Sequence, residues 1–231
     1  MRGYASYIKT ALEQEPENRL FEANAKYAAS FGGIPELSYY KTLERMSRQG
    51  LLVRLAKGLY YRPGKSKFGA VPISEKEIVD HYTLGGRGMV IGYKLYSRKG
   101  LTTQVSKRIE LLSSAVSGQK KTIRNVTVES SGMPLTENII PVIEALEILQ
   151  NYRCIEDLSK AALAAYMQKF ASDYIDVAAV YVLKHRRYKK ATIALLERFL
   201  NYFGVENTLR QFLSALSVYA IPEMKEFYEP A

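Results

Sequence analysis

The segment from Ser38 to Arg62, SYYKTLERMSRQGLLVRLAKGLYYR, constrains the fold more than any other part of the chain. Apolar side chains recur there every three residues, which predicts one buried stripe along a helix. The residues of this stripe are Leu37, Tyr40, Leu43 and Met46. Pro35 suits the first turn of a helix and Gly50 suits the position just past its end, so the spacing predicts a helix over 35–49.

A β-hairpin is expected directly after this helix. Residues 51–55 are apolar except for Arg54, and residues 59–61 are aromatic and strand-favouring. Lys57 and Gly58 stand between the two runs and can supply the turn. The sequence therefore predicts a short basic hairpin that follows a basic helix.

Residues 1–66 have the element order of a winged helix-turn-helix domain. The pattern predicts a helix over 4–14, a short strand over 20–22 and a short helix over 23–30, ahead of the basic helix and hairpin. Residues 63–69, PGKSKFG, are interpreted as the exit of the hairpin and an interdomain linker.

The rest of the chain, residues 67–231, is expected to form a second domain with a mixed α/β part over 67–134 and a helical part over 135–231. The fold class is therefore α+β. In the mixed part we expect helices over 74–82 and 93–98 and strands over 89–91, 108–112 and 122–128. In the helical part we expect a bundle with helices over 137–151, 157–170, 172–184, 188–203 and 208–220.

Positive charge is concentrated in the predicted helix and hairpin. Residues 35–70 hold eight Lys or Arg and two Glu, which gives +6 of the formal net charge of +10. Residues 135–231 hold eleven basic and twelve acidic residues, a net charge of −1. A solvated amphipathic helix also carries an outer basic face. The combination with a basic hairpin favours double-stranded DNA as the partner.

Ten residues are candidates for contact with DNA. A helix in the major groove would present side chains to base edges, and those candidates are Ser38, Tyr39, Lys41, Thr42 and Arg45. Phosphate or minor-groove contacts are expected from Arg48, Arg54, Lys57, Arg62 and Lys65. Tyr39 has a second interpretation as a core residue, because Tyr39 and Tyr40 cannot both face the same way. Regulators that read inverted repeats bind as twofold pairs, so a homodimer on DNA is expected.

A second basic cluster occupies residues 184–190, KHRRYKK. Its candidate contact residues are Arg186, Arg187, Lys189 and Lys190. One interpretation is a solvated turn at the negative end of a helix. The other is a second surface for DNA or for an RNA.

The inventory of reactive side chains argues against an enzyme. His81 and His185 are the only histidines, Cys154 is the only cysteine, and no spacing suits a metal site. The glycines near residues 85–92 are not followed by the Lys-Ser/Thr of a phosphate-binding loop. We therefore expect no catalytic residue, no cofactor and no metal. A lone cysteine and the lack of a long apolar run predict a cytoplasmic protein without a membrane segment.

Two stretches resemble the AbiEi family of antitoxins from bacterial type IV toxin-antitoxin systems. Residues 18–62, with RLFEANAKYAASFGG and ELSYYKTLERMSRQGLLVRLAKGLYYRP, look like the winged-helix domain of that family. Residues 90–114, with GLTTQV at 100–105, are similar to the start of its second domain. Relatives often have proline after this element, whereas Ser106 stands here, which affects the expected local turn.

The resemblance implies an antitoxin that binds repeats in the promoter of its own operon and represses it. It also implies that the second domain counteracts a nucleotidyltransferase-like toxin, which in this class need not touch the antitoxin. Two alternatives stay open: a winged-helix transcription regulator unrelated to toxin-antitoxin systems, and an adaptor that grips the toxin through the helical domain.

Overall fold

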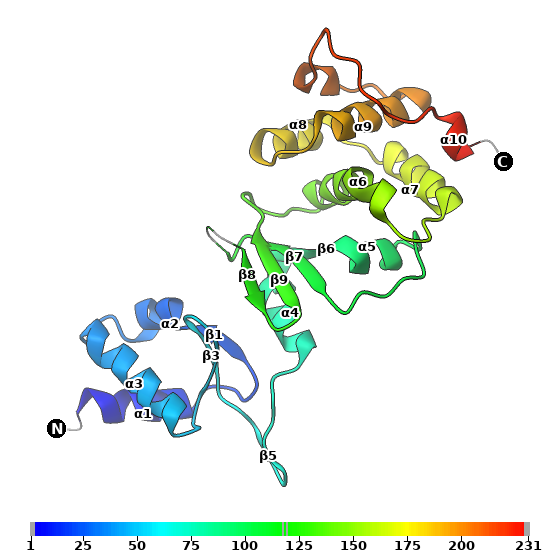
Figure 1. Cartoon of the computed structure of the whole chain (residues 1–231). Coiled ribbons are helices and arrows are strands. Elements are labelled where there is room, and N and C mark those ends of the chain that lie inside the picture. The colour runs from blue at the N-terminus through cyan, green and yellow to red at the C-terminus, as the bar shows by residue number, and fades with distance from the viewer. Residues whose placement is uncertain (1–2, 117, 119, 229–231) are drawn as a thin grey trace. The chain divides into compact units, whose positions relative to one another are not determined.

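The structure, a computed structural model, describes residues 3–116, 118 and 120–228 (Figure 1). The chain divides into two compact units, residues 1–81 and 82–231. The sequence placed this boundary after residue 66, and the structure places it after His81. The fold is mixed α+β, with a winged helix-turn-helix at the N-terminus, as the sequence predicts.

The first unit has the element order of a winged helix. Its helices are α1 (Tyr4–Glu13), α2 (Ala23–Ser30) and α3 (Glu36–Arg48), and its sheet is built from β1 (Leu20–Glu22), β2 (Val53–Ala56) and β3 (Leu59–Tyr61). The sheet order is β1-β3-β2, and both pairs are antiparallel. Strands β2 and β3 form the predicted wing, with Gly58 at a positive φ of 73° in its turn, a conformation that suits glycine.

The core of this unit lies between α1, α3 and the sheet. Ile8 and Leu12 come from α1, and Leu43 and Met46 from α3, and all four are almost fully buried. Phe21 of β1 stacks on Tyr60 of β3, with ring centroids 6.1 Å apart. This packing leaves only one face of α3 open to solvent.

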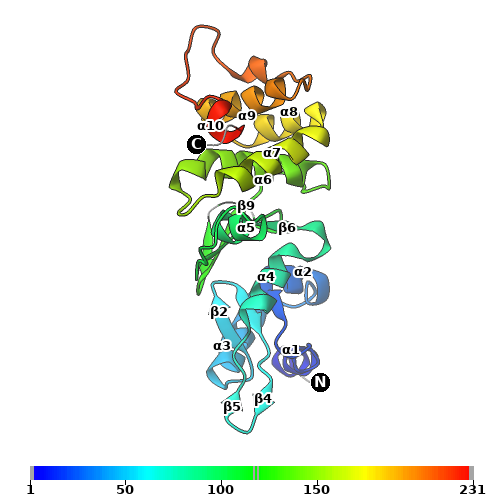
Figure 2. The ribbon, with the colours of Figure 1, turned by 90° about the vertical axis from the view of Figure 1, so that its right-hand side faces the viewer.

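The segment over 63–69, predicted as the exit of the hairpin and an interdomain linker, contains a second hairpin and belongs to the first unit. Strands β4 (Lys65–Ser66) and β5 (Gly69–Ala70) pair antiparallel. Both views in Figures 1 and 2 show this hairpin extending away from the helices of the first unit. Helix α4 (Glu75–Thr83) follows, and Ser74 caps its N-terminus, because the Ser74 Oγ accepts a hydrogen bond of 3.1 Å from the amide of Glu77.

The second unit begins with a four-stranded sheet in the order β6-β7-β9-β8. Strands β7 and β9 run parallel, and the two outer pairs are antiparallel. The bounds are η1 (Leu84–Gly86), β6 (Gly88–Ile91), α5 (Gly92–Arg98), β7 (Ile109–Ser113), β8 (Lys121–Ile123) and β9 (Val126–Ser130). The single strand predicted over 122–128 is wrong, because Arg124 adopts a positive φ of 55° and turns the chain between β8 and β9.

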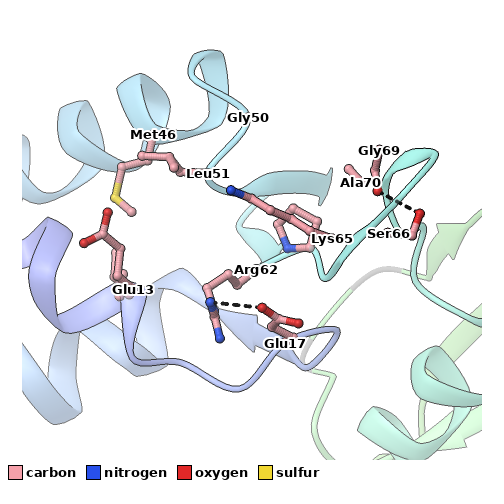
Figure 3. A pocket seen from close by; sticks show the side chains of 12 residues that line it. Glu13, Glu17, Met46, Gly50, Leu51, Arg62, Lys65, Ser66, Gly69 and Ala70 are labelled. Atoms are coloured by element: carbon pink, nitrogen blue, oxygen red, sulfur yellow. Dashed lines mark hydrogen bonds and ion pairs between the residues drawn. The ribbon is translucent and has the colours of Figure 1, made fainter.

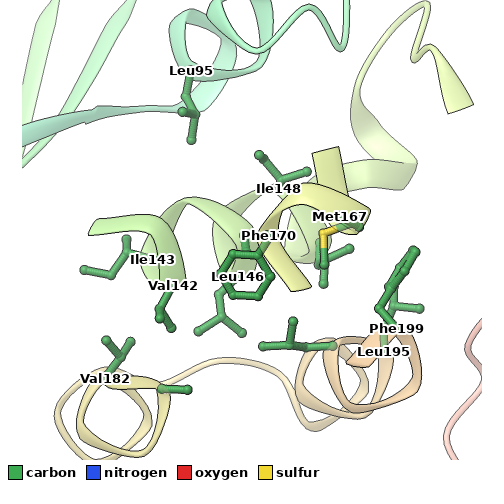
Figure 4. Packing of buried hydrophobic residues seen from close by; sticks show 14 of the residues in the cluster. Leu95, Val142, Ile143, Leu146, Ile148, Met167, Phe170, Val182, Leu195 and Phe199 are labelled. Carbon is green, nitrogen blue, oxygen red and sulfur yellow. The ribbon is translucent and has the colours of Figure 1, made fainter. Parts of the chain in front are cut away.

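The helical part packs on this sheet as one body with it. Its elements are α6 (Ile139–Asn151), η2 (Tyr152–Cys154), α7 (Lys160–Ser172), α8 (Asp176–His185), α9 (Lys190–Tyr202), η3 (Leu209–Phe212) and α10 (Lys225–Tyr228). Helix α6 lies between the sheet side and helices α8 and α9 (Figure 2). Figure 4 shows α6 residues such as Leu146 and Ile148 packed among side chains from α5, α7, α8 and α9. The sheet of the mixed part and the helices of the helical part therefore share one hydrophobic core.

The last predicted helix, over 208–220, is wrong. Only a 3-10 turn forms at 209–212, and the chain then has no further helix or strand until α10. Leu209 is fully buried, whereas Leu216 and Val218 project into solvent. The Tyr219 hydroxyl accepts a hydrogen bond of 3.0 Å from the amide of Ser214 and so ties this segment to itself.

The GLTTQV element joins α5 to the helical part. Thr102 Oγ1 donates to the carbonyl of Glu156 at 2.6 Å, and Gln104 Nε2 donates to Asp157 at 2.6 Å. The amide of Ser159 donates to the carbonyl of Leu101 at 2.9 Å. The element is thus a clasp within the second unit. Among the described residues, no helix is long and apolar enough to cross a membrane.

Candidate nucleic-acid interface

The buried face of α3 is rotated slightly from the predicted one, so that Leu43 and Met46 are buried as expected but Leu37 is not. Tyr39, Thr42, Leu43 and Met46 are buried, whereas Leu37, expected in the core, is 66% exposed. A three-residue spacing drifts around a helix of 3.6 residues per turn, so it misplaces the first residue of the stripe. The solvent face carries Leu37, Lys41, Arg45 and Arg48.

Tyr39 and Thr42 cannot read bases from these positions, which corrects two of the candidates. The ring of Tyr39 packs between Tyr27 and Phe31, with centroid distances of 5.2 and 5.1 Å. Burial, followed by the charge of Tyr40, raises the pKa of Tyr39 above its ordinary range. Thr42 Oγ1 donates back to the carbonyl of Ser38 at 2.7 Å, a bond within the helix. Ser38 itself is half-buried.

Exposed cations remain on α3, on the wing and on the second hairpin. They are Lys41, Arg45, Arg54, Lys57, Lys65 and Lys67. Among the described residues none of the six has an acidic partner. Helix α3 and strand β2 are separated only by residues 49–52, and β2 is an edge strand of its sheet. Uncompensated charge therefore gathers on consecutive elements of the first unit.

Two of the predicted phosphate contacts already have partners. Arg48 lies 2.6 Å from Glu44 Oε1, one turn earlier on the exposed face of α3. Arg62 donates through Nε to the carbonyl of Glu15 at 2.6 Å, and its Nη1 lies 3.3 Å from Glu17. These bonds tie β3 to the segment after α1. The Arg62 side chain is thus a structural link, which sets it apart from the predicted phosphate contacts without partners.

A pocket of about 490 Å³ lies within the first unit, beside the second hairpin (Figure 3). Met46, Gly50 and Leu51 line it from the end of α3, and Lys65 and Ser66 line it from the hairpin. In Figure 3 the Lys65 side chain extends across this pocket toward Gly50 and Leu51. The base of the hairpin therefore lies next to the C-terminal end of α3.

The second basic cluster is partly internal. Arg186 is half-buried and donates to Glu147 Oε1 through Nη2 at 3.0 Å and through Nε at 3.3 Å. The Tyr188 hydroxyl donates to the same oxygen at 3.2 Å. Lys190 Nζ donates to the carbonyl of Phe212. These contacts contradict the assignment of Arg186 to a free surface, because the buried carboxylate needs its charge.

The remaining cations of this cluster are Lys184, Arg187 and Lys189, and all three are exposed. Helix α8 ends in Lys184 and His185, which suits the negative end of its dipole. Burial, and then the charge of Glu147, raise the pKa of Tyr188 above its ordinary range. The geometry favours the solvated-turn interpretation for the outer residues and an internal ion pair for Arg186.

Among the described residues, no group of three or more His, Cys, Asp or Glu is arranged to hold a metal ion. The sequence pattern did not identify two exposed side chains that the structure brings into this region, Leu37 and Phe68. Leu37 stands in the first turn of α3, the part of a reading helix that meets bases. The sequence could have indicated this exposure of Leu37, because Leu37 stands two residues after Pro35 and so falls in the first turn of the helix.

The comparisons with known proteins give likenesses among solved structures alone. No protein-family model matches the chain, and no curated protein matches it. Among solved structures, the chain is similar to the RV2827C protein from Mycobacterium tuberculosis, with a TM-score of 0.44 and 12% sequence identity. The likeness covers 94% of this chain and 82% of that one.

Proposed function

We propose that the chain binds double-stranded DNA through α3 and the wing of its first unit. The observation that carries the proposal is the set of six exposed cations without acidic partners on α3, the wing and the adjoining β4–β5 hairpin. In a folded protein a cation without a partner costs little at the surface, yet six on one small unit repel one another. A polyanion removes that repulsion and releases its own counterions on binding.

The exposed residues of α3 can contact base edges, and those of the wing can contact phosphates. Arg45 and Lys41 can donate to guanine O6 and N7 in the major groove, and Leu37 can meet the methyl group of thymine. Arg54 and Lys57 lie on the wing, where a point charge next to phosphate adds affinity without reading sequence. Ser38, half-buried, contributes at most its hydroxyl to a base or phosphate.

A fluorescence anisotropy titration tests the proposal, with labelled DNA from upstream of the gene and a scrambled duplex of equal length. Arg45→Ala should weaken binding to the upstream DNA by about 1–3 kcal/mol and reduce discrimination from the scrambled duplex. Lys57→Ala should weaken both duplexes equally and reduce the slope of log affinity against log salt by about 1.

Lys9→Ala is the matched control, because it removes one cation from α1 and leaves α3 and the wing intact. The control should bind like the parent. If Arg45→Ala and Lys57→Ala also bind like the parent, the DNA interface lies elsewhere.

We further propose that the chain is an autorepressing antitoxin of a type IV toxin-antitoxin operon. This proposal is supported by the resemblance of residues 18–62 and 90–114 to the AbiEi family. The partners would be repeats in its own promoter, bound as a homodimer, and a nucleotidyltransferase-like toxin. Cytoplasmic localisation follows from that role, and no catalytic activity of the chain is required.

Co-expression with the neighbouring toxin-like gene tests the antitoxin role. The full chain should restore growth, and an Arg45→Ala variant that no longer represses the promoter should still restore it, because the second unit is intact. Failure of the parent chain to restore growth would leave a DNA-binding regulator of another kind. Recovery of the toxin in a stable complex with the full chain would favour the adaptor alternative over indirect antagonism.

A further inference from the structure

The β4–β5 hairpin holds an aromatic ring out in solvent. Phe68 is 90% exposed, at the turn between Lys65–Ser66 and Gly69–Ala70. Single exposed apolar side chains are common on protein surfaces, so exposure alone carries no argument. The way the turn is built and the positive charge around it suggest that Phe68 contacts a partner.

The turn is fixed by its own hydrogen bonds. Ser66 Oγ donates to the carbonyl of Gly69 at 3.1 Å and accepts from the amide of Phe68 at 3.2 Å. Gly69 has a positive φ of 107°, which a larger residue rarely adopts. A polar side chain and a glycine thus close the two-residue strands and hold Phe68 at the tip.

The base of the hairpin is anchored to the winged helix. The amide of Val71 donates to the carbonyl of Gly64 at 2.8 Å, and the amide of Gly64 donates to Asn18 Oδ1 at 3.1 Å. A Cβ at Gly64 would lie 2.9 Å from Asn18 Nδ2, so a larger residue here would push against the Asn18 side chain. The hairpin is therefore joined to the segment that precedes β1.

The tip combines positive charge with the apolar ring. Lys65 and Lys67 flank it, Lys67 Nζ lies 5.0 Å from the centre of the Phe68 ring, and residues 63–74 contain no acidic residue. A partner for this tip needs negative charge around a flat apolar slot. Stacked base pairs between phosphate chains supply both, whereas an apolar pocket on a protein does not need the lysines.

We propose that Phe68 is a wedge that enters the minor groove of bound duplex DNA and separates two neighbouring base pairs. The inference rests on the proposed DNA binding. The hairpin base lies next to the C-terminal end of α3, as the pocket between them shows. With α3 in the major groove, a hairpin at that end reaches across one phosphate chain into the adjacent minor groove. Lys65 and Lys67 then hold the phosphates on either side, and the duplex bends away from the inserted ring.

The chain has no tryptophan, so Phe68→Trp introduces a single indole fluorophore at the tip. On titration with the upstream duplex, the emission of this tryptophan should be quenched by the bases, and acrylamide should reach it less. Tyr4→Trp is the matched control, because Tyr4 is a 54% exposed aromatic residue of the same unit on α1. Its emission and its acrylamide quenching should stay the same with and without DNA.

The bend is measured by energy transfer between dyes at the two ends of the duplex. Phe68→Ala should bind about tenfold more weakly and lose the bend, since stacking on the ring is lost. Phe68→Leu should keep most of the bend, because leucine also acts as a wedge. Neither variant changes the charge of the tip, so the salt dependence of binding should match that of the parent.

The outcomes separate this inference from the proposed function. If the parent binds duplex DNA by anisotropy while Phe68→Trp behaves like Tyr4→Trp, the wedge is refuted and DNA binding stands. If the parent binds no duplex, both proposals fail. Protection of the introduced tryptophan at the tip by the toxin-like protein in the absence of DNA would assign the tip to a protein partner and overturn the wedge.

Discussion

Replacing Arg186 by methionine should destabilise the second unit by about 3 kcal/mol. Glu147 is 6% exposed, and Arg186 supplies two of the three hydrogen bonds that its Oε1 accepts, at 3.0 and 3.3 Å. Removing one partner of a buried ion pair costs about 3–5 kcal/mol. The lower end applies here, because the Arg186 side chain keeps 20% exposure and the Tyr188 hydroxyl still donates to the carboxylate at 3.2 Å.

Urea unfolding followed by far-UV circular dichroism measures this loss, since most helices belong to the second unit. Arg187→Met is the matched control: the neighbouring arginine is exposed, and its replacement should change the free energy of unfolding by less than about 0.5 kcal/mol. Combining Arg186→Met with Glu147→Leu should recover most of the lost stability, because no buried charge is then left without a partner.

The reasoning is refuted if Arg186→Met and Arg187→Met unfold at the same urea concentration with the same slope. That result would mean that water solvates Glu147 in place of Arg186. It would also return Arg186 to the basic surface that the sequence indicated.

Three further predictions concern other parts of the chain. Tyr39→Phe should raise the free energy of unfolding of the first unit by about 1 kcal/mol in the same urea assay, because the buried Tyr39 hydroxyl has no hydrogen-bond partner among the described residues; an unchanged DNA affinity would agree with its place in the core. Gly58→Ala should cost the wing about 1 kcal/mol, measured as a lower urea midpoint, because φ is positive there, and Gly58→Asn should cost less. Burial alone would raise the pKa of Asp176, but hydrogen bonds from Thr208 and Tyr174 lower it below its ordinary value of 3.8. The stability that this carboxylate adds is therefore present above about pH 3.8 and is lost as pH falls below it, so the difference between the parent and Asp176→Asn should shrink on acidification; a difference that grows would contradict the assignment.

Local patterns were sufficient for the winged helix and for most helices of the second unit. The wing was predicted from residues close together in the sequence, a Gly turn between two apolar runs. Two strands pair on either side of that turn in the structure. Helices α6 to α9 begin and end within a few residues of the predicted bounds, because each carries a long periodic apolar face. These elements could be predicted because their patterns lie within one short stretch of sequence and do not depend on contacts with distant residues.

The errors arose where a distant or weak contact decides the structure. Tyr39 is in the core because Tyr27 and Phe31 of the preceding segment enclose it, and spacing within α3 does not reveal them. Arg186 is internal because Glu147, 39 residues earlier, is buried. The β4–β5 hairpin has two-residue strands without branched or aromatic residues in them, so β propensity gives no signal.

The shared core of the second unit has a consequence for how this part of the chain can be divided. Met89 and Ile91 of the sheet and Leu95 of α5 bury their side chains in the same cluster as α6 and the helices beyond it. A gene fragment that stopped before α6 would encode a sheet with an uncovered apolar face and a clasp at Thr102 with no carbonyl to bind. Such a product should aggregate or be degraded, so a fragment of the second unit should fold only if it keeps the sheet and the helices that cover it together.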